Sequence, residues 1–270
     1  MGKLTGENVL ITGASRGLGR VFALHLAALG ANIGIIHRDL HTYKDYPYEA
    51  KEFKGDTVLD ELEAYDVKVS HAVADVTDFD ELQKAVNHIV SELGTITILI
   101  CNAGGGEGEL TAGMPSTMDM DQFDRVIRRN LYGTANTIRC VVPMMKENRK
   151  GRVVTLISHT GQSVNSSGSY SHYAAAKAGI MMYTKSLAME VGPYGITANC
   201  LSPGFILTGR LQQRFETAGA DMVVKNTALK RFGTPDEVAN AMEFLVSPES
   251  SYVTASILEV NGGTLGKINI

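Results

Sequence analysis

The sequence predicts an α/β fold, a single domain built on a doubly wound, parallel, seven-stranded sheet. Short apolar runs rich in β-branched residues alternate with helical apolar patterns along the whole chain. The first of these runs is followed by a glycine-rich turn and a helix. With 270 residues, 44% of them hydrophobic and 20% charged, the chain can bury one full core. We therefore expect one domain over residues 1–270.

The first unit is a strand, a glycine turn and a helix. The apolar run Val9–Thr12 precedes the turn, and apolar residues at helical spacing follow it as far as Gly30. Glycines let the backbone approach a pyrophosphate, which the free N–H groups and the positive end of the helix dipole attract. A turn that is glycine-rich for packing alone is the alternative. The predicted dinucleotide-binding residues of the turn are Gly13, Ser15, Arg16, Gly17, Leu18 and Gly19.

The second strand, Ile33–Ile36, ends at His37 and Arg38, where an NAD site usually has an acid for the ribose 2′-hydroxyl. Arg38 and Arg16 instead offer guanidinium groups suited to a 2′-phosphate, which favours NADP(H). Asp39 keeps NAD(H) open, and either arginine could be a solvated surface charge. The polar and aromatic segment 39–57 either clasps the adenosine half of the cofactor or is a solvated excursion.

The alternation continues through the middle of the chain. We expect a helix from Val58 to Tyr65, a strand over 67–74, a helix over 79–93 and a strand over 96–101. The glycine-loaded loop 104–118 follows, and its place at the end of a strand suggests that it borders the substrate. A long amphipathic helix is expected over 121–147. The last three strands are expected at 153–157, 196–201 and 257–260, with a capped helix that begins at Pro235 before the final one.

Tyr173 and Lys177 are four residues apart in the helix expected over 170–190, so their side chains share one face. An ammonium close to a phenol favours the phenolate, which would let Tyr173 exchange a proton near neutral pH. The strand 153–157 leads directly to Ser158, at the strand end where such sheets bind ligands. The alternative is an ordinary half-buried tyrosine beside a solvated lysine.

These motifs together resemble the short-chain dehydrogenase/reductase superfamily, over roughly residues 4–264. The resemblance rests on the glycine turn 13–19, the segment from Thr155 to Ser158, and Tyr173-Ala-Ala-Ala-Lys177. Further matches are Asn102-Ala103-Gly104, Asn130 and Pro203-Gly204-Phe-Ile206-Leu-Thr208. It implies a Rossmann fold with Tyr173 as proton donor, Ser158 bonded to the substrate oxygen, Lys177 lowering the tyrosine pKa, and Asn130 supporting a proton relay.

The resemblance also implies a set of cofactor contacts around this centre. Asp75 and Val76 would face the adenine, and residues 207–230 would form a mobile cover over the substrate. The interval from Ser158 to Tyr173 is two residues longer than is common in the family, which makes Thr160 a rival for the serine role. The remaining implied cofactor-binding residues are Asn102, Ala103, Gly104, Tyr173, Lys177, Pro203, Gly204, Ile206 and Thr208.

The implied reaction is hydride exchange between a nicotinamide cofactor and a carbonyl or secondary alcohol substrate. The leading hypothesis is an NADP-dependent carbonyl reductase acting on a ketone or a 3-oxoacyl group. An NAD-dependent alcohol or polyol dehydrogenase is the alternative, and a non-catalytic nucleotide-sensing protein ranks last. By resemblance we expect a homotetramer or a dimer assembled through helices 121–147 and 172–190.

Composition bounds the partners. The 25 basic and 29 acidic residues give a formal net charge of −4 without blocks of one sign, which favours a small molecule over nucleic acid or a membrane surface. The chain shows neither a signal peptide nor an apolar run of roughly 18 residues, so we expect a cytoplasmic protein. No metal site is expected, because Cys101, Cys140 and Cys200 are far apart and lack a His at ligand spacing.

Overall fold

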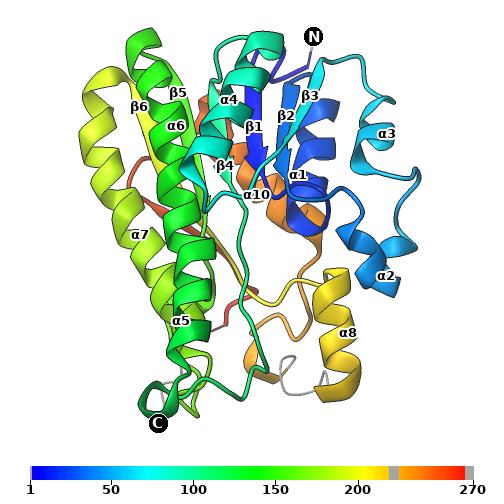
Figure 1. Ribbon diagram of the computed structural model, residues 1–270, viewed down its shortest axis with the longest axis vertical. Coiled ribbons are helices and arrows are strands. Elements are labelled where there is room, and N and C mark those ends of the chain that lie inside the picture. The colour runs from blue at the N-terminus through cyan, green and yellow to red at the C-terminus, as the bar shows by residue number, and fades with distance from the viewer. Residues whose placement is uncertain (1, 219–224, 265–270) are drawn as a thin grey trace.

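Seven parallel strands form one sheet in the order β3-β2-β1-β4-β5-β6-β7 in the computed structural model, which describes residues 2–218 and 225–264 (Figure 1). The predicted fold class is therefore confirmed. The strands are β1 (Asn8–Thr12), β2 (Asn32–His37), β3 (Val69–Val73), β4 (Ile98–Cys101), β5 (Gly151–Leu156), β6 (Ile196–Pro203) and β7 (Ile257–Val260). Because β2 and β3 lie on one side of β1, and β4 to β7 on the other, the strand order reverses between β1 and β4. That switch point is where open α/β sheets bind ligands.

Helices cover both faces of the sheet (Figure 1). One layer holds α1 (Gly17–Ala28), α3 (Val58–Leu62) and α10 (Pro235–Val246). The other holds α4 (Phe79–Leu93), α6 (Gly133–Asn148) and α7 (Ser171–Val191). Short helical turns in the connections are η2 (Pro115–Thr117), η4 (His159–Gly161), η5 (Gly192–Tyr194) and η6 (Pro248–Ser250).

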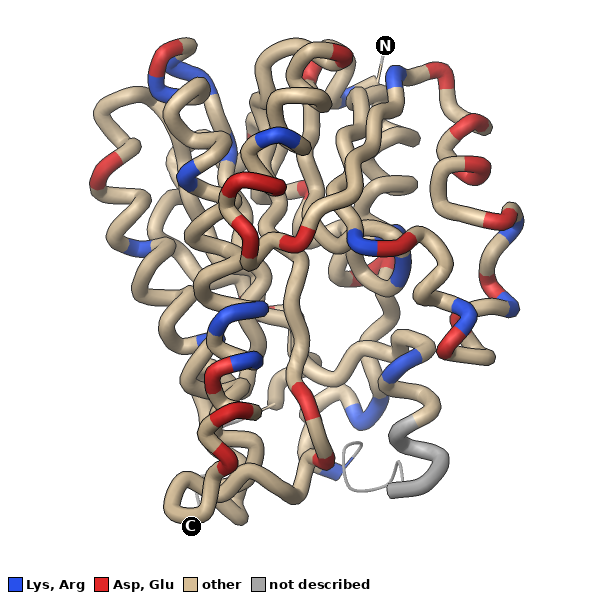
Figure 2. The backbone as a smooth tube through the Cα atoms, viewed as in Figure 1, with Lys and Arg blue, Asp and Glu red and all other residues tan. Residues whose placement is uncertain are grey.

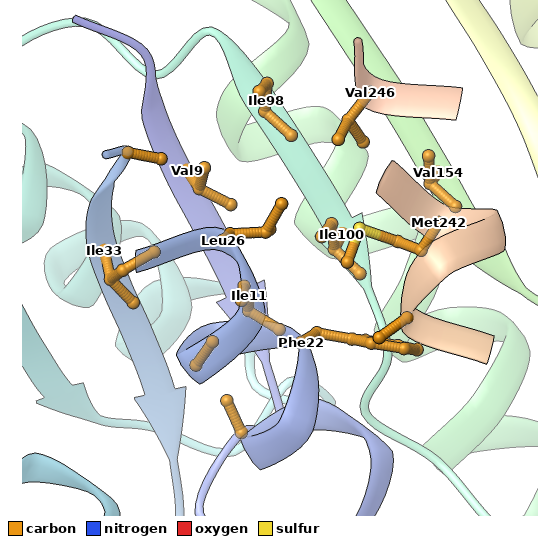
Figure 3. Close-up of a cluster of buried hydrophobic side chains, with 14 of the residues drawn as sticks. Val9, Ile11, Phe22, Leu26, Ile33, Ile98, Ile100, Val154, Met242 and Val246 are labelled. Atoms are coloured by element: carbon orange, nitrogen blue, oxygen red, sulfur yellow. The ribbon is translucent and has the colours of Figure 1, made fainter. Parts of the chain in front are cut away.

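The core has two halves because successive residues of each strand point to opposite faces. Ile11 belongs to the cluster that includes Phe22 of α1 and Met242 of α10 (Figure 3). Leu10, its neighbour in β1, belongs to the cluster on the other face with Leu82 of α4. All five of these large side chains are fully buried, and each such burial is worth about 1.5–3 kcal/mol.

The long helix predicted over 121–147 contains a widened turn. It consists of α5 (Met120–Ile127), a π-helical segment over Arg128–Tyr132, and α6. Asn130 lies in the π-helical segment and is fully buried, with its side-chain amide donating to the carbonyl oxygen of Val126 at 2.8 Å. Widened turns of this kind often occur at functional sites, because they re-aim one side chain without ending the helix.

The segment 39–57 is packed against the domain and is not a solvated excursion. It contains η1 (Thr42–Asp45) and α2 (Pro47–Ala50). Tyr43 is buried and stacks on Phe53 with 3.8 Å between ring centres, while Arg20 of α1 lies 4.2 Å from the centre of the Phe53 ring. The short helix α2 packs against α8 (Gly209–Ala218), as Figure 1 shows at the lower right. The segment therefore links the first βα unit to the expected substrate cover.

Part of that cover, residues 219–224, lies outside the described residues. Within residues 2–218 and 225–264, no helix combines the length and apolar composition needed to cross a membrane. The three cysteines are free thiols, and all are buried. Acidic and basic residues are interspersed along the backbone drawn in Figure 2.

Candidate active site

The glycine turn lies at the switch point, between the carboxyl ends of β1 and β4. Gly13 has a φ of +69°, and a Cβ there would lie 2.9 Å from the Cα of Ala103. A Cβ at Gly19 would overlap the carbonyl oxygen of Gly13 and lie 2.6 Å from the amide nitrogen of Asn102. Only glycine fits both positions, so the turn and the β4 end are packed backbone to backbone. Leu18 packs against the core cluster under α1.

Asn102 joins the two strand ends, as the sequence suggested. Its side-chain amide donates to the carbonyl oxygens of Thr12 at 3.1 Å and Gly13 at 2.8 Å. The hydroxyl of Thr12 accepts the backbone N–H groups of Asn102 and Ala103 at 3.2 and 3.1 Å. These bonds hold the turn in place next to Gly104 and the loop that follows it.

The predicted adenine-side residues Asp75 and Val76 follow β3, and Arg38 follows the neighbouring strand β2. Asp75 accepts the backbone N–H and the hydroxyl of Thr77 at 2.9 and 2.8 Å, and its other oxygen lies 3.7 Å from the Arg38 guanidinium. Burial opposes ionisation of Asp75, but the bonds from Thr77 and the charge of Arg38 outweigh it and hold its pKa below the ordinary value. Val76 is buried, and its carbonyl oxygen accepts the Asn136 amide at 3.1 Å.

A carboxylate that sequence reasoning missed lies against the glycine turn. Glu49 of α2 is 2% exposed and accepts the backbone N–H of Gly17 at the start of α1. Its other oxygen lies 3.4 Å from a guanidinium nitrogen of Arg16, which also stacks over Tyr46 at 4.3 Å. The hydroxyl of Ser15 is 3.3 Å from that of Thr42, a second link to the same segment. No sequence signal marks Glu49, because its role depends on how the segment 39–57 folds back.

On the other side of the switch point, Ser158 follows β5 and faces Tyr173. Its hydroxyl accepts the backbone N–H and the hydroxyl of Thr160 at 3.3 and 3.1 Å. A hydrogen bond from Ser158 acts on the phenol of Tyr173. Thr160, the rival for the serine role, thus donates two hydrogen bonds to the Ser158 hydroxyl and orients it.

Tyr173 and Lys177 lie on one face of α7, as predicted. The ammonium of Lys177 is 5.5 Å from the centre of the Tyr173 ring and donates to the carbonyl oxygen of Leu156 at 2.7 Å. The predicted direction of the tyrosine shift is wrong for this structure. Burial and the nearby Tyr170 raise the pKa of Tyr173 to about 12, against the opposing effects of Arg210 and Ser158. Burial likewise lowers the pKa of Lys177 to about 8, since desolvation penalises the charged form of each group.

Asn130 connects this pair to the loop after β4. Its side chain exchanges two hydrogen bonds with the backbone of Gly105, both at 3.0 Å. At the preceding residue, Gly104, a Cβ would lie 2.5 Å from the Asn130 oxygen and 3.6 Å from the Lys177 nitrogen. The amide and the ammonium therefore flank the same short stretch of backbone.

The segment after β6 lies across the same edge of the sheet. Pro203 ends β6, and the backbone N–H of Gly204 donates to Val260 at 2.9 Å. Ile206 is buried and forms a parallel bridge with Gly233, while Thr208 precedes α8. The segment 203–208 thus connects the central sheet to the expected cover.

Comparison with known proteins now identifies the family. The family model described as Enoyl-(Acyl carrier protein) reductase matches residues 13–264. A cyclohexanol dehydrogenase of Rhodococcus sp. (strain TK6) is 45% identical over 260 residues, which cover 96% of each chain. A short-chain type dehydrogenase/reductase from Mycobacterium marinum superposes with a TM-score of 0.86 at 29% identity, covering 98% of each chain. The chain belongs to the short-chain dehydrogenase/reductase superfamily.

This short-chain dehydrogenase/reductase is thus an oxidoreductase of alcohol or carbonyl groups that works with a nicotinamide cofactor. A 3-oxoacyl-[acyl-carrier protein] reductase with bound NAD from Brucella melitensis matches with a TM-score of 0.79 at 33% identity, covering 97% of this chain and 93% of that one. A dinucleotide bound at the glycine turn would share the start of α1 with a carboxylate of the protein. Arg16 provides no side-chain cap to α1, and the anion that the helix start holds is the carboxylate of Glu49.

The enzyme also has two site residues that the motifs did not indicate. Arg210, in the first turn of α8, donates to the carbonyl oxygen of Gly106 at 2.7 Å and exerts its charge on Tyr173. Tyr170 is buried with a φ of +61°, and its ring centre is 5.4 Å from that of Tyr173. The described residues contain no group of three or more His, Cys, Asp or Glu side chains that could hold a metal ion.

Proposed function

We propose that this enzyme exchanges a hydride between a nicotinamide dinucleotide and a secondary alcohol or its ketone, with Tyr173 moving the proton. The observation that carries the proposal is the meeting of three groups at the carboxyl end of β5. The Ser158 hydroxyl bonds the Tyr173 phenol, and the Lys177 ammonium lies 5.5 Å from the centre of the same ring. A non-catalytic nucleotide sensor would not require this combination.

When bound, the cofactor supplies or accepts the hydride at its nicotinamide ring. Tyr173 acts at the substrate oxygen, where it donates its proton during reduction and takes it back during oxidation. With a pKa raised to about 12, the phenol is protonated at neutral pH and is ready as a general acid. Ser158 donates a hydrogen bond to the same oxygen as negative charge develops on it, and Thr160 holds the serine in position.

Lys177 and Asn130 serve the proton pathway in this proposal. A lysine whose pKa is lowered to about 8 can gain or lose a proton near neutrality, unlike an exposed lysine. Its ammonium donates to the Leu156 carbonyl at 2.7 Å, and Asn130 braces the backbone of Gly105 beside it. Lys177 also remains the proposed partner of the nicotinamide ribose.

The substrate class that relatives favour is a small secondary alcohol or ketone. Support comes from the cyclohexanol dehydrogenase that is 45% identical to this chain along nearly its whole length. A 3-oxoacyl thioester is the second candidate, supported by the 33% identical 3-oxoacyl-[acyl-carrier protein] reductase. Our prediction of a carbonyl reductase covers the reductive direction of both candidates.

Two features of the proposal concern cofactor and assembly. NADP(H) is the cofactor that a free Arg16 and a free Arg38 would favour, and NAD(H) is the one expected where carboxylates hold these arginines.

We further propose a dimer or tetramer assembled through the α5–α6 region and α7. Met182, Tyr183 and Met189 of α7 are large apolar side chains, 57%, 38% and 79% exposed. A cytoplasmic location stays a prediction from the sequence.

A direct test is a spectrophotometric screen of the purified protein for cofactor oxidation and reduction. Cyclohexanone, linear ketones and a 3-oxoacyl thioester would be offered with NADH and NADPH, and the matching alcohols with the oxidised cofactors. We expect turnover of cyclic or linear ketones that is abolished in Lys177→Met. Binding of a dinucleotide without turnover of any substrate would favour the nucleotide sensor instead.

A further inference from the structure

The segment 39–57 brings a nearly buried carboxylate to the cofactor end of α1. Glu49 is held there by the Gly17 N–H and the Arg16 guanidinium. Tyr46 covers the other side of Arg16, with 4.3 Å between the guanidinium carbon and the ring centre. The arginine side chain is only 25% exposed, so this ion pair is partly shielded from water and from salt. Arg16 is thus engaged by two residues of the segment.

The packing around Glu49 keeps its carboxylate in this position. A Cβ at Gly209 would lie 2.5 Å from the Cβ of Glu49, so α8 closes directly on the side chain. Beyond α2, the Tyr43 hydroxyl donates to the carbonyl oxygen of Asp56 at 2.8 Å, and Tyr43 stacks on Phe53. These contacts anchor the segment on both sides of α2. Rotating the carboxylate away would require the segment or α8 to move.

The second arginine of the predicted 2′-phosphate site is also paired. Arg38 lies 3.7 Å from Asp75, whose lowered pKa keeps it ionised at neutral pH. Each guanidinium charge at the ribose side is therefore matched by a carboxylate. A 2′-phosphate brings about two further negative charges, which two balanced ion pairs attract far less than two free arginines would. A ribose 2′-hydroxyl brings no charge, and a carboxylate can accept a hydrogen bond from it.

We propose that Glu49 is a specificity-determining residue that makes this site select NAD(H) over NADP(H). Glu49 replaces the acidic residue that NAD sites usually have at the end of β2. In this chain, His37 and Arg38 occupy that position. The carboxylate comes from a packed insertion and acts by neutralising Arg16. This inference rests on the proposed function, because it presupposes that the glycine turn binds a dinucleotide.

The test measures binding of two small probes that differ only by the 2′-phosphate, 5′-AMP and 2′,5′-ADP. Calorimetric titration of the full-length protein gives both dissociation constants without any catalysis. The wild type should bind 5′-AMP more tightly. In Glu49→Gln, which keeps the side-chain shape and removes its charge, the ratio of the two constants should shift toward 2′,5′-ADP by about tenfold or more. Intact NADH and NADPH, titrated by their fluorescence, should shift in the same direction.

Two further variants separate this effect from its alternatives. Asp45→Asn removes a charge from an exposed side chain of the same segment and should leave the ratio unchanged. Arg16→Gln introduced into Glu49→Gln should abolish the gain, because the freed guanidinium is what attracts the 2′-phosphate. Circular dichroism and thermal melting establish that each variant is folded.

The outcomes are distinct. If Glu49→Gln tightens both probes equally, the carboxylate competes with the phosphate common to both, and the specificity role is overturned. A wild type that already prefers 2′,5′-ADP and NADPH overturns it as well. If neither probe nor either dinucleotide binds, the proposed function fails together with this inference.

Discussion

Replacing Tyr173 with Phe should remove the proton donor and leave the rest of the site in place. The substitution deletes one oxygen from a half-buried ring on α7, and the ring itself keeps its contact with Tyr170 at 5.4 Å between centres. Positioned general acids contribute about 10²–10⁴-fold to rate, which corresponds to about 2.7–5.5 kcal/mol of barrier. With a pKa of about 12, essentially every wild-type Tyr173 carries this proton at pH 7. We therefore expect Tyr173→Phe to lose about 10²–10⁴-fold in turnover.

The assay follows ketone reduction at pH 7 through the absorbance of the reduced cofactor. Cofactor affinity, measured separately by fluorescence, should stay within about twofold, because the hydroxyl acts on the substrate oxygen. The matched control is Tyr170→Phe, which deletes the same oxygen from a neighbouring buried ring. That control should keep turnover within about tenfold of the wild type.

Two results would refute the reasoning. One is a Tyr173→Phe enzyme that retains turnover within tenfold of the wild type while cofactor binding is unchanged. The other is an equally deep loss in Tyr170→Phe, which would show that any hydroxyl removed from this pocket disturbs it.

The remaining predictions concern pH, the glycine turn and a buried ion pair. Because the pKa of Tyr173 is raised to about 12, alcohol oxidation, which needs the phenolate, should accelerate from pH 7 to 9. Ketone reduction, which needs the phenol, should change little from pH 6 to 8. Initial rates in both directions check this, and an oxidation rate that falls from pH 7 to 9 contradicts it. Gly19→Ala should weaken dinucleotide binding at least about tenfold, because the added Cβ would lie 2.6 Å from the Asn102 amide nitrogen. Fluorescence titration tests this, with Gly192→Ala as the control, because a Cβ at Gly192 meets open space. Glu61→Gln should lower the free energy of unfolding, measured by urea denaturation, by about 3–5 kcal/mol. The two carboxylate oxygens of Glu61 accept hydrogen bonds from the buried Arg20 guanidinium at 2.6 and 2.5 Å, and the variant leaves that guanidinium without its charge partner. A loss below about 1 kcal/mol would contradict the prediction.

Local sequence pattern was sufficient to predict the strands and helices of the fold and the positions of the proposed catalytic residues within them. Apolar runs and helical stripes report directly on which face of an element is buried, so strands such as Ile257–Val260 and helices such as Phe79–Leu93 were predicted at their observed bounds. Tyr173 and Lys177 are one helical turn apart, and Ser158 follows a strand, so each could be placed by its neighbours in the chain.

The helix predicted over 121–147 contains a feature that the apolar pattern cannot predict. Its apolar stripe continues across the π-helical segment Arg128–Tyr132, so periodicity alone gives no sign of the widened turn. That turn coincides with the bonds between Asn130 and Gly105, whose positions are separated by 25 residues. Only the folded chain brings them together.

The electrostatics of the site depended on the tertiary structure in the same way. From the sequence, Lys177 lowers the pKa of Tyr173, and Arg16 is free for a phosphate. In the fold, burial raises the tyrosine pKa to about 12, and Glu49 pairs with Arg16 across 33 positions of sequence. The sequence by itself determined which elements form and which reactive side chains they carry, because those properties are local. The tertiary structure decided how those side chains are charged and paired, because desolvation and Coulomb forces depend on distances through space that the order of residues does not contain.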